Sequence, residues 1–123
     1  MQREEIEAFV VDWVQAFNRR DLDAVLTHFD ECVRFTSPRA VAVVGVPTVE
    51  GKAALRHYWS QALARVRTLK FTLDHTLWDA DRWELVIVYV AERDGRRQRV
   101  CERLRLNHAG RAVEGEVTLG VEL

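Results

Sequence analysis

Glu102 is the residue whose setting in this sequence suggests chemistry. It stands in a run where apolar residues alternate with arginines, so the side-chain alternation of a strand places its carboxyl group beside Leu104 on the apolar face. A turn in which Asn107 pairs with Gly110 would put Glu102 opposite Gly115, next to a space that glycine leaves empty. A carboxyl group removed from water has a raised pKa, which suits a general acid or base near neutral pH.

Two further residues are candidates to act with Glu102. Tyr89 is expected on the same face of the neighbouring strand, where its hydroxyl either satisfies the buried carboxyl group or assists it in catalysis. His75 lies between Leu73 and Leu77 in an alternating run, and is either a core residue or an acid/base partner whose tautomer Glu102 fixes. We therefore predict Glu102, His75 and Tyr89 as the candidate catalytic residues.

A pocket around Glu102 would be walled by aromatic residues and closed by polar residues near its mouth. Ser37 and Arg39 follow the end of a strand, and Arg39 is either a solvated loop residue or a partner for an anionic ligand group. Most of the aromatic residues are expected in the core, with one or two at the pocket wall. The candidate ligand-binding residues are Trp13, Phe17, Phe35, Ser37, Arg39, Tyr58, Trp59, Trp83 and Val117.

The rest of the chain supplies elements that can position these residues. Apolar residues at helical spacing predict a helix over residues 6–17, a short second helix whose N-cap is Asp21, and a third helix after Gly51. The pair Asp94-Gly95 predicts a tight hairpin because both turn positions need φ > 0. Strands are predicted over residues 32–36 and 69–78, followed by three consecutive strands between residues 82 and 123.

This order of elements predicts a single α+β domain over residues 1–123. We expect a cone-shaped, curved antiparallel sheet packed by three N-terminal helices on one face, with a central pocket where large side chains are too few to fill the cone. The stretch Ala40–Pro47 is apolar without a clear period, and is either a short strand or a loop folded over the mouth of the pocket.

Composition excludes several classes of function. Eighteen basic and 19 acidic residues give a net charge of −1, so no general attraction to nucleic acid or to a membrane is expected. The arginines between residues 93 and 105 alternate and face Glu114 and Glu116, which indicates a solvated or dimer-forming sheet surface. Cys32 and Cys101 have no metal-ligand spacing, so we expect no metal site and reduced thiols in a cytoplasmic protein. No nucleotide-binding glycine loop is present, and no cofactor is expected.

Four stretches, in this order and spacing, resemble the nuclear transport factor two-like superfamily in its SnoaL-like and ketosteroid-isomerase-like branch. They are FNRRDLDA at 17–24, VRFTSP at 33–38, VEGKAAL at 49–55 and LNHAGR at 106–111. The resemblance runs almost from end to end and implies a cystatin-like α+β barrel that forms a homodimer through its sheet. The superfamily includes isomerases, dehydratases, epoxide hydrolases, polyketide cyclases and proteins with no known catalysis, so the resemblance implies a fold rather than one activity.

The ketosteroid isomerases can be compared with the chain residue by residue. Their general-base aspartate corresponds to Ser37, their oxyanion tyrosine to Trp13, and their second carboxyl group to Glu102. A serine with no adjacent base is a poor proton acceptor, and an indole lacks the acidity of a phenol. The resemblance therefore does not imply steroid isomerisation, and the aspartate–arginine–aspartate constellation of the limonene epoxide hydrolases has no counterpart here.

We therefore expect a pocket protein that binds a small apolar molecule, cyclic ligands included. Glu102 would serve as general acid or base in isomerase, cyclase or dehydratase chemistry without a cofactor. The alternative is a non-catalytic module that binds a ligand or forms a dimer. The substrate does not follow from the sequence.

Overall fold

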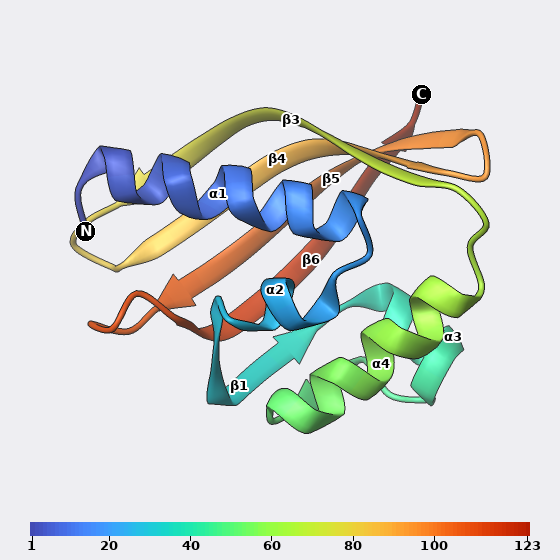
Figure 1. The fold of residues 1–123 in the computed structure, drawn as a ribbon, viewed down its shortest axis with the longest axis horizontal. Helices are drawn as coiled ribbons and strands as arrows, with labels where there is room; N and C mark the ends of the chain where they lie inside the picture. The colour runs from blue at the N-terminus through green and yellow to red at the C-terminus, as the bar shows by residue number, and fades with distance from the viewer.

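The computed structural model describes all 123 residues as a curved six-stranded sheet with four helices packed on one face (Figure 1). The helices are α1 (Arg3–Asn18), α2 (Leu22–Leu26), α3 (Pro38–Val44) and α4 (Lys52–Ala64). The strands are β1 (Phe29–Thr36), β2 (Thr48–Glu50), β3 (Leu69–Asp79), β4 (Glu84–Arg93), β5 (Arg96–Leu106) and β6 (Ala112–Glu122), in the spatial order β2-β1-β6-β5-β4-β3.

The predicted α+β class and curved sheet are confirmed, with two corrections. The sheet is mixed rather than antiparallel, because β1 runs parallel to β6. The helices number four rather than three, because residues 38–44 form α3. No helix has the length and apolar composition that crossing a bilayer requires.

Helix α3 replaces both structures that the sequence suggested for Ala40–Pro47. The Oγ of Ser37 accepts a hydrogen bond from the backbone N–H of Arg39 at 3.3 Å, and Pro38 occupies the first turn, where its missing N–H costs nothing. Gly45 ends the helix in the left-handed conformation, with φ of 86°. These end signals outweigh the β-branched residues between them.

The pairing of β5 with β6 differs from the predicted register by two residues. Glu102 lies opposite Val117, and Gly115 lies opposite Leu104. The register shifts between Arg105 and Leu106, where the turn into β6 begins. A slip of two residues keeps every side chain on its predicted face, so Glu102 still points into the concave side of the sheet even though its predicted glycine neighbour was wrong.

Strand β3 contains an irregularity that the alternation did not reveal. Its register against β4 shifts between Leu73 and His75, so the residues after this point face the opposite way. Thr76 then lies opposite the fully buried Ile87, whereas His75 lies on the outer face with 53% of its side chain exposed, 3.5 Å from Asp74. The predicted place of His75 on the apolar face was therefore wrong.

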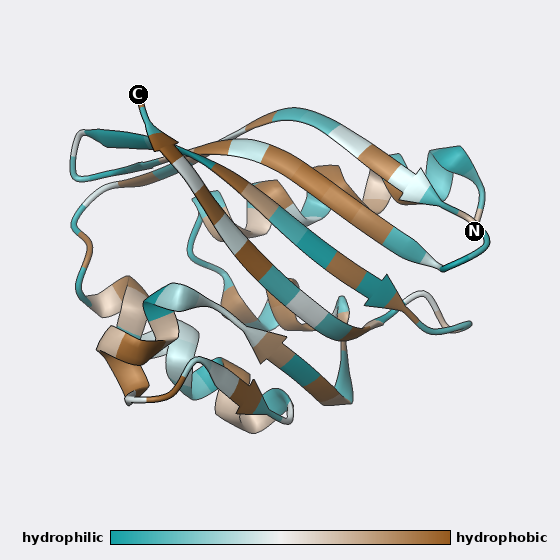
Figure 2. Cartoon of the chain, turned by 180° about the vertical axis from the view of Figure 1, so that it is seen from behind, coloured by the Kyte–Doolittle hydropathy of each residue, from teal (hydrophilic) through white to brown (hydrophobic).

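The outer face of the sheet carries ion pairs between neighbouring strands. Arg103 contacts Glu84 at 3.2 Å and Glu116 at 3.1 Å, and Arg105 contacts Glu114 at 2.7 Å. Hydrophilic and hydrophobic segments alternate along these strands, as seen from this side (Figure 2). Ion pairing accounts for the alternating arginines, and the homodimer expected through this face remains a prediction.

Gly115 is required by close packing rather than by backbone conformation. A Cβ atom there would lie 2.7 Å from Cδ2 of Phe35 and 3.0 Å from Cδ2 of Leu104, both of which are buried. We expect Gly115→Ala to lower the free energy of unfolding by about 1–3 kcal/mol because the added methyl group overpacks the core. Urea denaturation measures this free energy. As a control, Glu114→Ala removes a carboxylate that pairs with Arg105 on the outer face, and is expected to lower the free energy of unfolding by less than about 1 kcal/mol. Equal stability of Gly115→Ala and wild type would contradict the packing.

Candidate functional site

A cavity of about 230 Å³ lies between α3, α4 and the concave face of the sheet. Fifteen of its 20 lining residues are hydrophobic, so the cavity is suited to an apolar molecule. An apolar cavity of about 150 Å³ accommodates benzene. The space here is therefore enough for a body of one or two rings.

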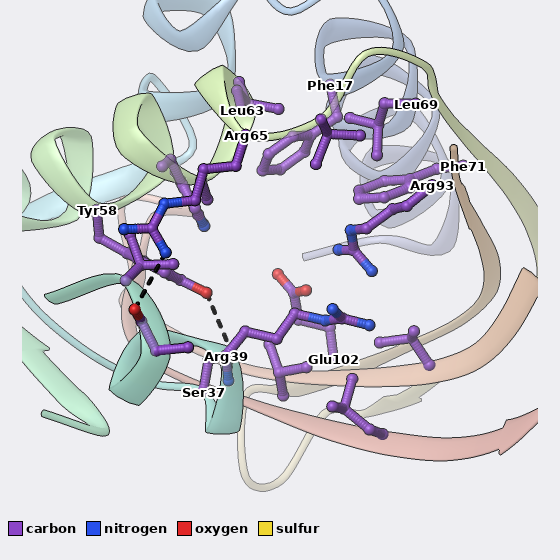
Figure 3. A pocket seen from close by; sticks show the side chains of 18 of the residues that line it. Phe17, Ser37, Arg39, Tyr58, Leu63, Arg65, Leu69, Phe71, Arg93 and Glu102 are labelled. Carbon is purple, nitrogen blue, oxygen red and sulfur yellow. Dashed lines mark hydrogen bonds between the residues drawn. The ribbon is translucent and has the colours of Figure 1, made fainter. Parts of the chain in front are cut away.

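Nine of the twelve predicted site residues line this cavity. They are Phe17, Phe35, Ser37, Arg39, Tyr58, Trp59, Tyr89, Glu102 and Val117. The polar ends of Tyr58, Arg39 and Glu102 face a common open space (Figure 3). The structure thus brings together most of the residues that the sequence singled out.

Three predicted residues lie elsewhere. His75 points away on the outer face, so it forms no acid/base pair with Glu102. Trp13 is completely buried behind the cavity, 4.9 Å from Phe17 and 5.5 Å from Tyr89 between ring centroids. Trp83 stacks on a histidine of the β5–β6 turn at 4.6 Å and is not among the lining residues. Trp13 therefore supports Tyr89 from behind, and Trp83 belongs to another part of the molecule.

Glu102 sits on β5 with only 3% of its surface exposed. The hydroxyl of Tyr89 donates a hydrogen bond to its Oε1 at 3.0 Å, while Oε2 is buried and has no partner. A buried carboxylate oxygen is nearly always hydrogen-bonded in a folded protein. The carboxyl group of Glu102 points toward the open space of the cavity (Figure 3), and Glu102 is one of the residues that line it.

Burial raises the pKa of Glu102 to about 7. Removal from water is the main cause, and it outweighs the hydrogen bond from Tyr89 and the positive charge of Arg93, both of which favour the ionised form. The pKa of Tyr89 is also raised well above its ordinary value, chiefly by burial and then by the charge of Glu102. Tyr89 therefore stays a hydrogen-bond donor at neutral pH, while Glu102 can hold or release a proton.

Tyr58 and Ser37 form a second polar group at the cavity wall. The Tyr58 hydroxyl donates to Oγ of Ser37 at 3.4 Å, a long contact that leaves the hydroxyl able to reorient. Burial raises the pKa of Tyr58, so this hydroxyl is also protonated near neutral pH. Ser37 is committed to capping α3 and has no adjacent base, so it provides structure rather than proton transfer.

Two lining arginines were not anticipated as site residues. Arg93 lies at the end of β4 and Arg65 follows α4 at the mouth, where it donates to the carbonyl oxygen of Ala42 at 3.1 Å. Side-chain alternation along β4 already indicated the place of Arg93, because Arg93 follows Tyr89 by four positions and therefore lies on the same face. A charged residue beside the Asp94-Gly95 hairpin nevertheless suggested exposure to solvent.

The fold and the match to a family model define a protein of the nuclear transport factor two-like superfamily, as the resemblance had predicted. Within it, this chain belongs to the SnoaL-like family, since the model of the SnoaL-like domain matches residues 10–115. None of the curated proteins compared with the chain is significantly similar in sequence.

Solved structures support the same assignment. A SnoaL-like protein of unknown function from Burkholderia thailandensis E264 is 25% identical, with a TM-score of 0.85 over 98% of this chain and 99% of its own. SalBIII, an epoxide hydrolase/cyclase-like enzyme in pyran ring formation in the polyether salinomycin, is 21% identical over 98% of this chain and 95% of its own, with a TM-score of 0.77. TerC, crystallised with polyporic acid, is 12% identical over 93% of this chain and 90% of its own, with a TM-score of 0.77. At these identities the last two share the fold.

Proposed function

We propose that this protein binds a small apolar molecule in the cavity and transfers a proton on it through Glu102. The observation that carries the proposal is a buried carboxyl group at the wall of an apolar cavity, with one of its oxygens, Oε2, lacking a hydrogen-bond partner. The large majority of buried polar atoms in folded proteins have a hydrogen-bond partner, so an unpartnered carboxyl oxygen calls for a functional explanation. A pKa of about 7 is also close to the optimum for a group that both accepts and returns a proton at neutral pH.

The chemistry that fits this arrangement is proton abstraction beside a carbonyl group. Glu102 Oε2 takes the proton from the carbon atom, the C–H electron pair moves into the adjacent carbonyl group, and an enolate forms. The Tyr58 hydroxyl, which lines the cavity and makes only a long contact to Ser37, would donate a hydrogen bond to the enolate oxygen. Return of the proton to another carbon completes an isomerisation, and cyclisation or dehydration can begin with the same step.

A non-catalytic binding module is the second candidate. Its support is the absence of a second acid/base group beside Glu102, because His75 lies on the outer face and Ser37 caps a helix. Such a protein would use the same cavity and would place Glu102 as a hydrogen-bond partner for the ligand.

Proton exchange in D₂O distinguishes the two functions. Cyclic ketones such as 2-indanone, 1-tetralone and cyclohexenone are incubated with the protein, and loss of their α-proton signals is followed by NMR. We expect protein-dependent exchange whose rate rises with pH and levels off above about 7, because the ionised form of Glu102 is the base. Ligand binding without exchange would support the binding module, and absence of both would contradict both functions.

Two substitutions on one strand test whether exchange occurs in the cavity. Val117→Phe fills the space opposite Glu102 and is expected to abolish both exchange and binding. Thr118→Ser changes the next residue, which is exposed and points to the other face, and is expected to retain both. Thermal unfolding verifies that each variant is folded.

A further inference from the structure

None of the three arginines at the cavity has an acidic partner, and Arg65 donates instead to the carbonyl oxygen of Ala42. Arg39 of α3 and Arg93 of β4 both line the cavity, yet neither takes part in any of the twelve ion pairs of the structure. Most other arginines on the sheet are paired with carboxylates across strands. Both residues are partly buried, and burying part of an arginine without a counter-charge has a cost, so these two residues call for an explanation.

The donors of both guanidinium groups are largely unused. One Nη of Arg39 donates to Oε1 of Gln98 at 2.6 Å, but its Nε is buried without a partner. Arg93 makes no side-chain hydrogen bond, and its guanidinium carbon lies 5.8 Å from the ring centre of Phe71. Gln98 therefore holds Arg39 in place while leaving donors free, and Phe71 supplies an apolar surface beneath Arg93.

The charges around the cavity do not balance. Its lining contains three arginines and one carboxyl group, and Glu102 takes part in none of the twelve ion pairs. The pKa of Arg93 is lowered, first by burial and then by repulsion from the positive charge of Arg39. An anion between the two guanidinium groups would relieve this repulsion and use the free donors.

We propose that the ligand is an apolar carboxylic acid whose carboxylate group is bound between Arg39 and Arg93, with its hydrocarbon body in the cavity. A guanidinium group presents paired N–H donors that match a carboxylate, and two such groups can share one anion. Fifteen of the 20 lining residues are hydrophobic, which suits an acid with an apolar body. This inference rests on the proposed function only in assigning the ligand to the same cavity.

The geometry also relates the carboxylate to Glu102. The polar ends of Arg39, Arg93 and Glu102 face one open space (Figure 3). A carboxylate held by the arginines would place its neighbouring carbon atoms near the carboxyl group of Glu102. The substrate class is accordingly a one- or two-ring acid that reacts close to its carboxylate group.

Matched acids and amides test this inference by calorimetry at pH 8. The probes are benzoate and benzamide, phenylacetate and phenylacetamide, and 2-naphthoate and 2-naphthamide. We expect at least one acid to bind about tenfold or more tightly than its amide, since hydrogen bonds to a charged group are stronger than hydrogen bonds to a neutral one. Arg39→Gln and Arg93→Gln are each expected to lower the acid's affinity about tenfold and to leave the amide's affinity unchanged.

Control variants separate a local contact from a general charge effect. Arg97→Gln removes the same charge from an exposed position on β5 and is expected to leave the acid-to-amide ratio unchanged. Arg93→Lys keeps the charge without the paired donors and should retain part of the preference, which also provides a test where Arg93→Gln fails to fold.

The inference is overturned where no acid in the panel binds more tightly than its amide, or where the ratio survives in the folded variants of both arginines. The test is independent of catalysis, because the ratio of acid affinity to amide affinity can be measured without turnover. Acid selectivity without proton exchange would support the inference and contradict the catalytic proposal. Exchange of neutral ketones without acid selectivity would do the reverse.

Discussion

The Glu102→Gln variant is expected to exchange α-protons at least about 100-fold more slowly than the wild-type protein. Glutamine has the same shape and can still accept the hydrogen bond from Tyr89, so the cavity is retained. Its amide, however, cannot take a proton from carbon, and a positioned general acid or base contributes about 10²–10⁴-fold to such a reaction. The NMR exchange rate of the best ketone at pH 8 measures the loss.

The matched control makes the same chemical change outside the cavity. Glu116→Gln removes a carboxylate from the outer face of β6, where it pairs with Arg103, and is expected to keep the exchange rate within about twofold. A wild-type rate in Glu102→Gln would show that Glu102 is not the base, and an equal loss in both variants would indicate a general effect of charge.

The burial of Glu102 could be predicted because it depends only on the alternation of side chains between the two faces of the strand. The predicted register of β5 against β6 was wrong by two residues, yet a shift of two preserves the face on which each side chain lies. The hairpin that sets the register of β4 against β5 was also predictable, since Asp94 and Gly95 take φ values of 50° and 82°. Local turn chemistry and alternation therefore sufficed for the Tyr89–Glu102 pair.

The place of His75 could not be predicted because it depends on a backbone irregularity. The shift in β3 falls at Asp74, where no glycine or proline marks it, and it reverses the direction of every residue that follows. Parity is reliable only along an uninterrupted ladder. Both assignments used the same alternation. Strand β5 pairs with β4 without a shift from Arg96 to Arg105, which includes Glu102, whereas the pairing of β3 with β4 shifts just before His75.

Helical spacing identified the core aromatic residues but not those that reach the cavity. Trp13 and Phe17 lie one turn apart on the same face of α1, and only Phe17 lines the cavity. Which of them does so depends on where the helix crosses the sheet, which spacing along one helix does not specify.

Helix α3, in contrast, had its end signals in Ser37-Pro38 and Gly45, and the run of valines between them concealed these signals.

The burial of Glu102 also predicts that the protein is less stable at high pH than the Glu102→Gln variant. The carboxyl group has a pKa of about 7 in the folded protein against an ordinary value of 4.5, so the folded state binds the proton more tightly than the unfolded state. The resulting stabilisation is fully present below pH 4.5 and is lost as the pH rises to about 7, because the unfolded chain ionises freely while the folded chain resists. At 1.36 kcal/mol per pH unit, this difference corresponds to about 3 kcal/mol.

Urea denaturation from pH 4.5 to pH 8 measures this contribution as the difference between two proteins, which cancels the titration of all other groups. Glutamine has no charged form to bury, so Glu102→Gln should gain about 2–3 kcal/mol over the wild type at pH 8 and approach it at pH 4.5. Glu116→Gln, whose carboxylate is exposed, should show no such gain. Parallel stability curves for the wild type and Glu102→Gln would mean that the carboxyl group is hydrated in the folded protein. The desolvation on which both the base and its cavity depend would then be absent.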